Sequence, residues 1–402
     1  MNSFEEFRIV MDGDSVFYAG DSVSGRVRMR VNSALTLQSL RASAVGKVYV
    51  QMPDGVQENQ RVVLERSWDV LDPEQSSSAT RLYSLSLVGT REFPFWMKTT
   101  PQLPTSFEGE FGHVRYVLSV EAKVVKNEGK PSMVRDTVAD RRPFTIVQAT
   151  EFSSVEKNVY QGVDKIVREE VEQSRWCCKS SGIISFELNL PRTVFACGEN
   201  INLGGFVENT SRIRVRLASA KLFMKVDYHI NASQQTSNIK EICQAAVCMY
   251  VRRGDCNRIE HALAVPPLAP TAIKEASVEF PFIAIKYELL LTVQPMGIKA
   301  LHASVPVHIA TEPVAAGDRE RWDLVCRGVK NYAENYKKIF RIYRTPFWQK
   351  KIQLSRLPDQ LVSTTEEDLE YVNKYPFWVG LSSGSKLSKQ IEVALDKLSI
   401  VK

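Results

Sequence analysis

Hydrophobic and polar residues alternate along most of the first 150 residues of the chain. In the segment SGRVRMRV, Val27, Met29 and Val31 fall on one side and three arginines fall on the other. Alternation with a period of two is typical of a β-strand that buries one face. Similar runs recur between clusters of Pro, Gly, Asp and Ser, so the pattern predicts an antiparallel β-sandwich over residues 1–150.

The same strand pattern returns after a charged segment and continues over residues 177–313. In the charged segment, hydrophobic residues recur at near-helical spacing, and Ser153 with Glu156 matches a capping box. The pattern therefore predicts a helical linker over residues 151–176, with the helix itself at about 153–173. The hydrophobic residues that define this spacing are Val155, Val159, Ile166 and Val171.

The two strand-rich regions repeat each other at several points. Gly20 in YAGDSVSG has a counterpart in Gly198 of FACGENINLGG, and Ala42 has a counterpart in Ala218. The segments VRYVLSV and IKYELLL form a third, looser pair. The members of each pair are about 170–180 residues apart, and a near-constant offset is what a duplicated sandwich would show. We therefore expect the members of each pair to occupy equivalent positions in two equivalent sandwiches.

Residues 314–402 form a tail whose pattern of hydrophobic and polar residues differs from that of the strand-rich regions and of the charged segment. Its most regular part is a stripe of hydrophobic residues at steps of three and four, which predicts one amphipathic helix over about residues 318–345. The stripe consists of Trp322, Val325, Val329, Tyr332, Tyr336, Ile339 and Tyr343. Such a stripe is too apolar to remain in water, so it packs either on the chain's own sandwiches or on an acidic membrane or a partner protein. Further along, KYPFWVG stands out as an aromatic island.

The composition limits which kinds of partner and which cellular location we expect for this protein. The chain has 402 residues and a net charge of +6, without a long basic run interleaved with aromatic residues, so we expect no nucleic-acid partner. A peripheral contact with an acidic membrane is compatible with that charge. The first ten residues lack the basic and apolar regions of a signal peptide, and the seven cysteines form no dense framework. We therefore expect a cytoplasmic protein with reduced thiols.

The residue types that serve in catalysis or metal binding form no recognised active-site or metal-site motif in this sequence. The chain has no glycine-rich phosphate loop and no HExxH motif, its histidines are scattered, and His113 is interpreted as a structural residue. Cys243, Cys248, Cys256 and His261 lack the spacing of a typical zinc site. We therefore expect no enzyme, no cofactor and no metal site.

Two arginine triplets are candidate partner-binding sites, because a guanidinium pairs with a carboxylate or a phosphate through two parallel hydrogen bonds. The triplets are Arg26, Arg28 and Arg30, and Arg212, Arg214 and Arg216. The alternative is that each triplet is only the solvated face of a half-exposed strand. The adjacent Cys177 and Cys178 are candidates for S-acylation, with two thiols at the start of a strand as the alternative.

One long segment resembles the motif of a known family. The segment FPFWMKTTPQLPTSFEGEFGHVRYVLSVEA, residues 93–122, resembles the N-terminal-domain motif of the α-arrestins, the arrestin-domain-containing proteins. FACGENI resembles the opening of that family's C-terminal domain. The resemblance covers about residues 1–150 and 177–313. It implies an all-β fold of two tandem arrestin-like antiparallel β-sandwiches, to which the periodicity above adds the linker helix and the helical tail.

The resemblance implies a non-enzymatic adaptor that binds cytoplasmic segments of membrane proteins at the plasma membrane or endosomes. Such an adaptor would link its cargo to trafficking machinery, in protein transport and endocytosis, or to ubiquitination machinery. Many α-arrestins recruit a ubiquitin ligase through a Pro-Pro-x-Tyr motif, which this chain lacks, since VPPLAP at 265–270 has no tyrosine. The alternative is a scaffold that resembles the retromer cargo-binding subunit and works in endosomal sorting without a ubiquitin ligase.

Overall fold

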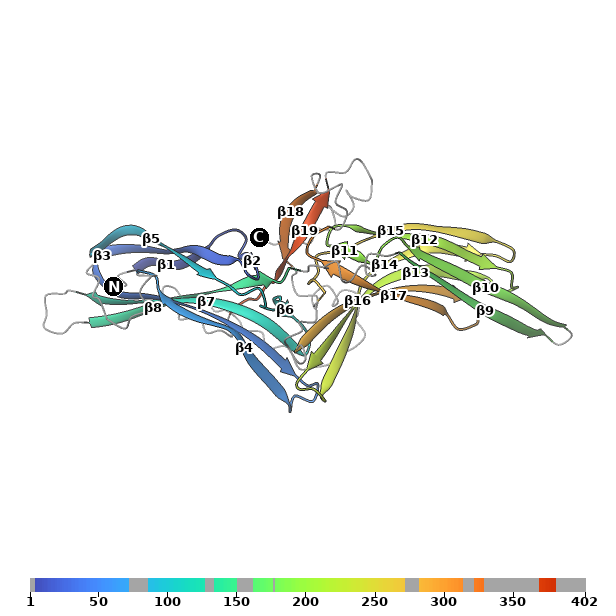
Figure 1. Cartoon of the computed structure of the whole chain (residues 1–402), viewed down its shortest axis with the longest axis horizontal. Coiled ribbons are helices and arrows are strands. Elements are labelled where there is room, and N and C mark those ends of the chain that lie inside the picture. The colour runs from blue at the N-terminus through green and yellow to red at the C-terminus, as the bar shows by residue number, and fades with distance from the viewer. Residues whose placement is uncertain are drawn as a thin grey trace.

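The fold consists of strands throughout the described part of the chain. The computed structural model describes residues 4–71, 86–126, 134–149, 162–175, 178–271, 282–313, 322–328 and 369–380. Every regular element within these ranges is a β-strand. The strands form two elongated sandwiches that lie end to end, with a two-stranded sheet between them (Figure 1). The all-β fold predicted from the alternation is therefore confirmed.

The first sandwich consists of β1 (Phe4–Met11), β2 (Val16–Tyr18), β3 (Ser22–Gln51), β4 (Glu58–Asp69), β5 (Ser86–Lys98), β6 (Phe107–Glu108), β7 (Gly112–Lys126) and β8 (Val134–Val147). Its central element is β3, which is 30 residues long. The first half of β3 pairs with β1 and β5, and the second half pairs with β4 and β7. A shift in register between Val31 and Leu35 separates the two halves, so one strand serves both layers of the sandwich.

Burial confirms the alternation that the sequence shows. Val27, Met29 and Val31 are at most 1% exposed, while the arginines between them lie on the outer face of β3. Tyr116 and Leu118 of β7 are fully buried in the same core. The core of the first sandwich is thus built from every second residue of its central strands.

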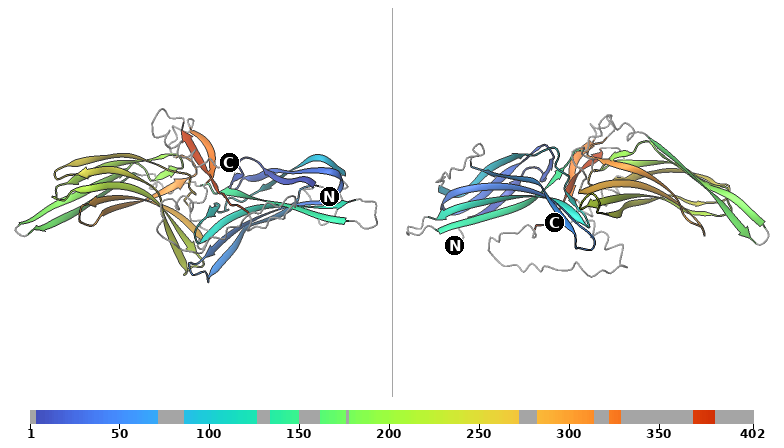
Figure 2. Two further views of the ribbon diagram at one scale, coloured as in Figure 1. Left: turned by 180° about the vertical axis from the view of Figure 1, so that it is seen from behind. Right: turned by 60° about the horizontal axis from the view of Figure 1, so that its bottom comes forward.

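The second sandwich consists of β9 (Val163–Arg175), β10 (Cys178–Leu190), β11 (Val194–Ala196), β12 (Asn200–Asn209), β13 (Val215–His229), β14 (Gln235–Val251), β15 (Cys256–Ala264), β16 (Ile283–Pro295) and β17 (Leu301–Ala310). One layer is a four-stranded sheet in the order β15-β12-β10-β9. The other layer is a five-stranded sheet in the order β11-β17-β16-β13-β14. Figure 2 shows the two sandwiches from behind and from below.

The duplication expected from the sequence is confirmed by the strand pairing. Gly20 and Gly198 each follow a short strand that pairs in parallel, β2 with β8 and β11 with β17. Their φ angles are +94° and +95°, in the left-handed region that favours glycine. Ala42 lies between partners on β4 and β7, as Ala218 lies between partners on β14 and β16. Both pairs therefore occupy equivalent positions.

A buried tyrosine hydroxyl is bound in the same way in each sandwich. Tyr116 of β7 donates its hydroxyl to the carbonyl oxygen of Pro104 at 2.6 Å. Tyr287 of β16 donates its hydroxyl to the carbonyl oxygen of Ala269, also at 2.6 Å. Both side chains are at most 3% exposed. The duplication thus extends from strand order to individual hydrogen bonds.

The predicted linker helix is wrong where the structure describes it. Residues 163–175 form β9, which pairs antiparallel with β10 along its whole length. The segment also alternates with a period of two, because Val163 and Val167 pack against the core while Ile166 is 57% exposed. A full partner strand outweighs a capping box, since an isolated helix of this length is only marginally stable. The second sandwich therefore begins at β9, and residues 153–161 lie outside the described residues.

The predicted tail helix is wrong at its start. Trp322 and Val325 lie in β18 (Trp322–Gly328), which pairs antiparallel with β19 (Lys374–Gly380). The aromatic island of the sequence is β19 itself, and its Tyr375 and Phe377 are 3% and 5% exposed. Pairing with a strand far along the chain and burial of these rings override the local helical period. The other members of the predicted stripe lie outside the described residues: Val329, Tyr332, Tyr336, Ile339 and Tyr343.

The two buried tyrosines provide a test of the duplication. A Tyr116→Phe or a Tyr287→Phe substitution removes a buried hydroxyl and leaves a carbonyl oxygen without its donor. Each variant should lose about 1 kcal/mol of unfolding free energy, measured by urea denaturation followed by circular dichroism. A loss at only one of the two positions would contradict the equivalence of the two sites.

Candidate functional site

A segment from the C-terminal part of the chain lies between the two sandwiches. We define the interdomain strap as residues 369–380, which include β19. Figures 1 and 2 show β18 and β19 standing together between the sandwiches. The strap is remote in sequence from most of the residues that it contacts, so it links parts of the chain that the strand ladders do not connect.

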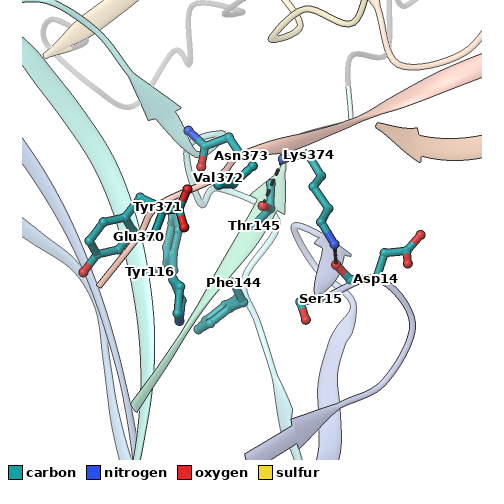
Figure 3. A pocket seen from close by; sticks show the side chains of 11 residues that line it. Asp14, Ser15, Tyr116, Phe144, Thr145, Glu370, Tyr371, Val372, Asn373 and Lys374 are labelled. Carbon is teal, nitrogen blue, oxygen red and sulfur yellow. Dashed lines mark hydrogen bonds between the residues drawn. The ribbon is translucent and has the colours of Figure 1, made fainter. Parts of the chain in front are cut away.

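The first half of the strap is bound to the first sandwich. Tyr375 donates its hydroxyl to the carbonyl oxygen of Ser106 at 2.8 Å. Lys374 donates its backbone N–H to Oγ1 of Thr145 at 3.3 Å and its Nζ to the carbonyl oxygen of Asp14 at 2.8 Å (Figure 3). Burial raises the pKa of Tyr375 well above its usual range, so the phenol remains a hydrogen-bond donor at physiological pH.

A cavity of about 180 Å³ lies beside these contacts. Its walls include Tyr116 and Phe144 of the first sandwich and residues 370–374 of the strap (Figure 3). The guanidinium of Arg115 lies over the ring of Tyr371, 4.3 Å from the ring centroid. A cation in this position stabilises the packing of the aromatic ring. Beside this cavity, the strap therefore contacts the first sandwich through Tyr371 as well as through Lys374 and Tyr375.

The second half of the strap is bound to the second sandwich. Trp378 donates its backbone N–H to the carbonyl oxygen of Cys197 and its Nε1–H to the carbonyl oxygen of Thr311, each at 2.9 Å. The carbonyl oxygen of Trp378 lies directly against Gly198, where a Cβ atom would have no room. Burial raises the pKa of the Cys197 thiol to about 12, so this thiol remains protonated. The strap thus ties the second sandwich to the first.

A second group of contacts joins the sandwiches directly. Asn59 of β4 donates from Nδ2 to the carbonyl oxygen of Ile230 at 2.7 Å. The rings of Phe111 and Tyr228 pack edge to face with centroids 5.7 Å apart, and the backbone N–H of Glu110 donates to the Tyr228 hydroxyl at 3.2 Å. These contacts lie where the β3–β4 hairpin approaches the β13–β14 hairpin (Figure 1). The sandwiches are therefore joined at two separate places.

The first arginine triplet lies on the outer face of β3, where neighbouring strands supply carboxylates. The ion pairs are Arg26–Glu92 at 3.4 Å, Arg28–Glu6 at 3.6 Å and Arg30–Glu5 at 2.7 Å. Pairs of this kind on a surface contribute little to stability. They do offset the positive charge of the triplet, so an incoming anion would have to displace a glutamate from its arginine. The role of this triplet in partner binding stays a prediction.

The second arginine triplet has a different environment. Arg212, Arg214 and Arg216 are exposed around the turn that leads into β13. Within the described ranges, none of the three forms an ion pair. The two triplets share a sequence pattern but differ in the charge that they present to a partner, and the role of the second triplet also stays a prediction.

One residue of the predicted S-acylation pair lies at the far end of the second sandwich, in the strands β9 and β10. Cys178 is the first residue of β10 and lies opposite Arg175 of β9, while Cys177 is outside the described residues. The S-acylation of Cys177 and Cys178 stays a prediction.

Among the described residues, no group of three or more His, Cys, Asp or Glu side chains is arranged as a metal site. No helix in the same ranges is long and apolar enough to span a membrane.

Comparison with known proteins identifies the family of both sandwiches. The family described as Arrestin (or S-antigen), N-terminal domain matches residues 7–152, and the family described as Arrestin (or S-antigen), C-terminal domain matches residues 180–314. Two equivalent antiparallel sandwiches in tandem are the architecture that these matches imply. The chain therefore belongs to the arrestin family, among the arrestin-domain-containing proteins (α-arrestins).

Individual relatives carry the same family name. The chain is 22% identical over 323 residues to arrestin domain-containing protein 5 of Homo sapiens, and the matched region covers 78% of this chain and 90% of the relative. It is 23% identical over 337 residues to the Bos taurus protein of that name, covering 80% of this chain and 97% of the relative. Arrestin domain-containing protein 15 of Caenorhabditis elegans is 27% identical over 217 residues, covering 52% of this chain and 55% of the relative.

Sequence reasoning does not find the interdomain strap as a site. The only signal is the aromatic island KYPFWVG, in which Tyr375 and Phe377 alternate with other residues as in a strand. Such a pattern predicts burial, but it does not say which surface covers the rings. The hydrogen bonds to both sandwiches become visible only once the chain is folded.

The two equivalent glycines provide a test of the strap. A Cβ atom on Gly198 would meet the Trp378 carbonyl oxygen, whereas a Cβ atom on Gly20 has the Pro101 Cγ as its nearest neighbour, at 3.3 Å. Both Gly→Ala variants should lose about 1–2 kcal/mol of unfolding free energy through the positive φ angle. Gly198→Ala should lose more and should also increase cleavage of the strap by a protease. Equal losses and equal cleavage in the two variants would contradict the proposed contact.

His113 has contacts that support its structural interpretation. Its ring stacks on Tyr49 with centroids 5.2 Å apart. Burial, followed by the nearby charge of Arg115, lowers the pKa of His113 from 6.5 to about 4. The native state therefore favours the neutral imidazole.

This pKa predicts a dependence of stability on pH. Above pH 6.5, His113 is neutral in the native and the unfolded state, so pH has no effect through it. Between pH 6.5 and about 4 the unfolded state binds a proton that the native state does not, so the free energy of unfolding falls as the pH falls. A His113→Gln variant should show a shallower fall over this window in urea denaturation. Parallel curves for the two proteins would rule out this contribution.

Proposed function

We propose that this protein is a non-enzymatic adaptor that binds cytoplasmic segments of membrane proteins and links them to protein transport and endocytosis. Membership of the arrestin family supports an adaptor role. In this proposal the protein acts in the cytoplasm and at the plasma membrane or endosomes. Its sandwiches supply binding surfaces, and no chemical step is involved.

The observation that carries the proposal is the way in which the strap holds two sandwiches as one body. Tyr375 binds the first sandwich and Trp378 binds the second, and Asn59 joins the sandwiches again at the hairpins. A body of fixed shape can present separate surfaces to two partners at once, as an adaptor must. Fixed surfaces also lose less conformational entropy when a partner binds.

The outer face of the first sandwich is the proposed contact for acidic or phosphorylated cargo segments. A cargo carboxylate or phosphate would replace Glu6 or Glu92 as the partner of Arg28. Trp96 on β5 lies opposite Ser24 on the same three-stranded face and is 65% exposed. An exposed tryptophan beside arginines is typical of the residues that contribute most to protein interfaces. An extended cargo segment with several acidic groups would therefore fit this face best.

The downstream machinery is the finer part of the proposal. Since the chain lacks a Pro-Pro-x-Tyr motif, a ubiquitin ligase would be recruited through another protein. The alternative is a scaffold that works in endosomal sorting without a ligase, in the manner of the retromer cargo-binding subunit. The two versions share the cargo surface and differ only in the second partner.

Affinity purification of the full-length chain from cells tests the proposal. The wild type should enrich membrane proteins with acidic cytoplasmic segments. A variant that combines R26Q, R28Q, R30Q and Trp96→Ser should reduce this enrichment at least about tenfold, because it removes both the charge and the apolar contact. The matched control R41Q/R66Q/K123Q removes three exposed cations from the other layer of the same sandwich. This control should leave the enrichment unchanged.

The outcomes distinguish the versions of the proposal. A partner list without membrane proteins, compared with an unrelated β-sandwich as bait, would contradict the adaptor function. Equal losses in the variant and its control would contradict the proposed cargo face. Co-purified ubiquitin-ligase subunits favour the ubiquitination link, whereas co-purified endosomal sorting subunits without a ligase favour the retromer-like alternative.

A further inference from the structure

The first strand of the second sandwich has one edge without a partner strand. β9 is the end strand of the four-stranded sheet, and it pairs with β10 along its whole length without a register shift. On its other side it pairs with no strand in the part of the chain that the structure describes. Figure 1 shows β9 on the hairpin that reaches furthest from the first sandwich. An open edge of this kind can bind a further strand.

The backbone of residues 163–168 is available for such a strand. Within the described ranges, these residues form no backbone hydrogen bond outside the ladder with β10. The other layer of the sandwich is tied to β9 by a side chain, because Nζ of Lys165 donates to the carbonyl oxygen of Ser304 on β17. An inward-pointing charge can protect an edge, but Lys165 has its partner within its own chain. It therefore leaves the backbone of the edge open.

Other edge strands carry protection that β9 lacks. Proline and β-bulges are common devices that prevent an edge from pairing with another chain. β5 contains Pro94, and the pairing of β14 with β13 has two register shifts. β9 contains no proline, and its ladder with β10 is regular. Its edge is therefore suited to pairing.

Three exposed residues alternate along the outer face of this edge: Asp164, Ile166 and Arg168. Ile166 is 57% exposed although it is large and apolar. Arg168 forms no ion pair with a described residue, and Asp164 accepts a hydrogen bond from Nδ2 of Asn189. In an antiparallel pair the order acid, apolar, base meets the order base, apolar, acid. The edge is therefore complementary to a second copy of itself.

A twofold axis through Ile166 gives the register that uses this complementarity. It places Ile166 opposite the Ile166 of the second copy, and Asp164 opposite the second copy's Arg168. By symmetry the same charge pair forms again on the other side of the axis. Opposite charges and β-branched residues that face each other stabilise an antiparallel ladder. The paired stretch runs from Val163 to Glu169.

Neighbouring registers are less favourable. An axis through Val167 would place Asp164 opposite Glu170 and Ile166 opposite Arg168. An axis through Lys165 would place two lysines opposite each other. An axis between two residues would bring the outer face of one strand against the inner face of the other. The charges therefore favour a single register.

We propose that β9 forms a symmetric dimer interface, in which the edges of two copies pair antiparallel and join their four-stranded sheets into one continuous sheet. Val163 lies opposite Leu190, at the end of β10 that leads to the strap. Antiparallel pairing therefore puts the two first sandwiches at opposite ends of the dimer, and both proposed cargo faces lie away from the contact. The inference goes beyond the proposed adaptor function, since the contact needs no cargo.

The interface is short, so the dimer should be weak. A paired stretch of this length buries less surface than the about 1,200–2,000 Å² of a stable complex. Sedimentation velocity of the full-length protein should show the average mass rising from one chain toward two as the concentration increases. The series should extend to about 200 µM, where a complex with a micromolar dissociation constant is mostly formed. A chain that stays monomeric throughout would overturn the proposal.

Charge reversal tests the register. Asp164→Arg and Arg168→Asp each place like charges opposite each other on both sides of the axis, so each should raise the dissociation constant at least about tenfold. The double variant Asp164→Arg/Arg168→Asp restores opposite charges and should dimerise within about threefold of the wild type. An equimolar mixture of the two single variants should form a heterodimer for the same reason. Equal thermal unfolding of the variants shows that the fold is retained. Wild-type association by either single variant, or no association in the mixture, would overturn the proposal.

Cysteine cross-linking tests the position of the axis. Ile166→Cys should form a disulfide between two copies on mild oxidation, since residues directly opposite each other have Cβ atoms about 4.5–5.5 Å apart. The matched control Ile183→Cys changes a residue on the neighbouring β10 that is 45% exposed. Mass spectrometry of the linked peptides separates the new disulfide from links through native cysteines. Equal cross-linking of the two variants, or none in Ile166→Cys, would place the contact elsewhere and overturn the proposal.

Discussion

The close approach of the Trp378 carbonyl oxygen to Gly198 is the contact on which the position of the strap between the two sandwiches depends. Gly198 has a positive φ and no side chain, so the backbone of the strap can lie directly against this turn. Three residues earlier, about 10 Å along the strand, Tyr375 binds the carbonyl oxygen of Ser106 in the first sandwich. The separation of the two sandwiches at the strap is thus set by a few residues of one strand.

The alternation of hydrophobic residues was sufficient to predict the all-β fold, because every half-buried strand shows a period of two in its own sequence. The duplication was predicted separately, from the near-constant offset between repeated segments. β9 and β18 show the limit of this reasoning. Ile166 and Val325 belong to helical spacings as well as to strands, and the choice between the two was made by β10 and β19. A local period contains no information about a partner strand, so both predicted helices failed where the structure describes them.

The candidate sites show the same limit. Two arginine triplets with identical spacing were equal as predictions, yet Arg28 lies between Glu6 and Glu92 from adjacent strands, whereas Arg214 forms no ion pair with any of the residues that the structure describes. Charge balance depends on side chains from elsewhere in the sequence, which spacing alone cannot identify. The strap was missed for the same reason, since KYPFWVG shows that it will be buried and not what will bury it.

The continuous β3 of the first sandwich corresponds to two separate strands in the second. Where β3 has only a register shift between Val31 and Leu35, the second copy ends β12 and begins β13 after an exposed turn. There the side chain of Asn209 binds the backbone, donating from Nδ2 to the carbonyl oxygens of Ile213 and Val251. The two copies therefore differ in whether this strand is continuous, and the interruption gives the second copy an exposed turn that carries Arg212 and Arg214.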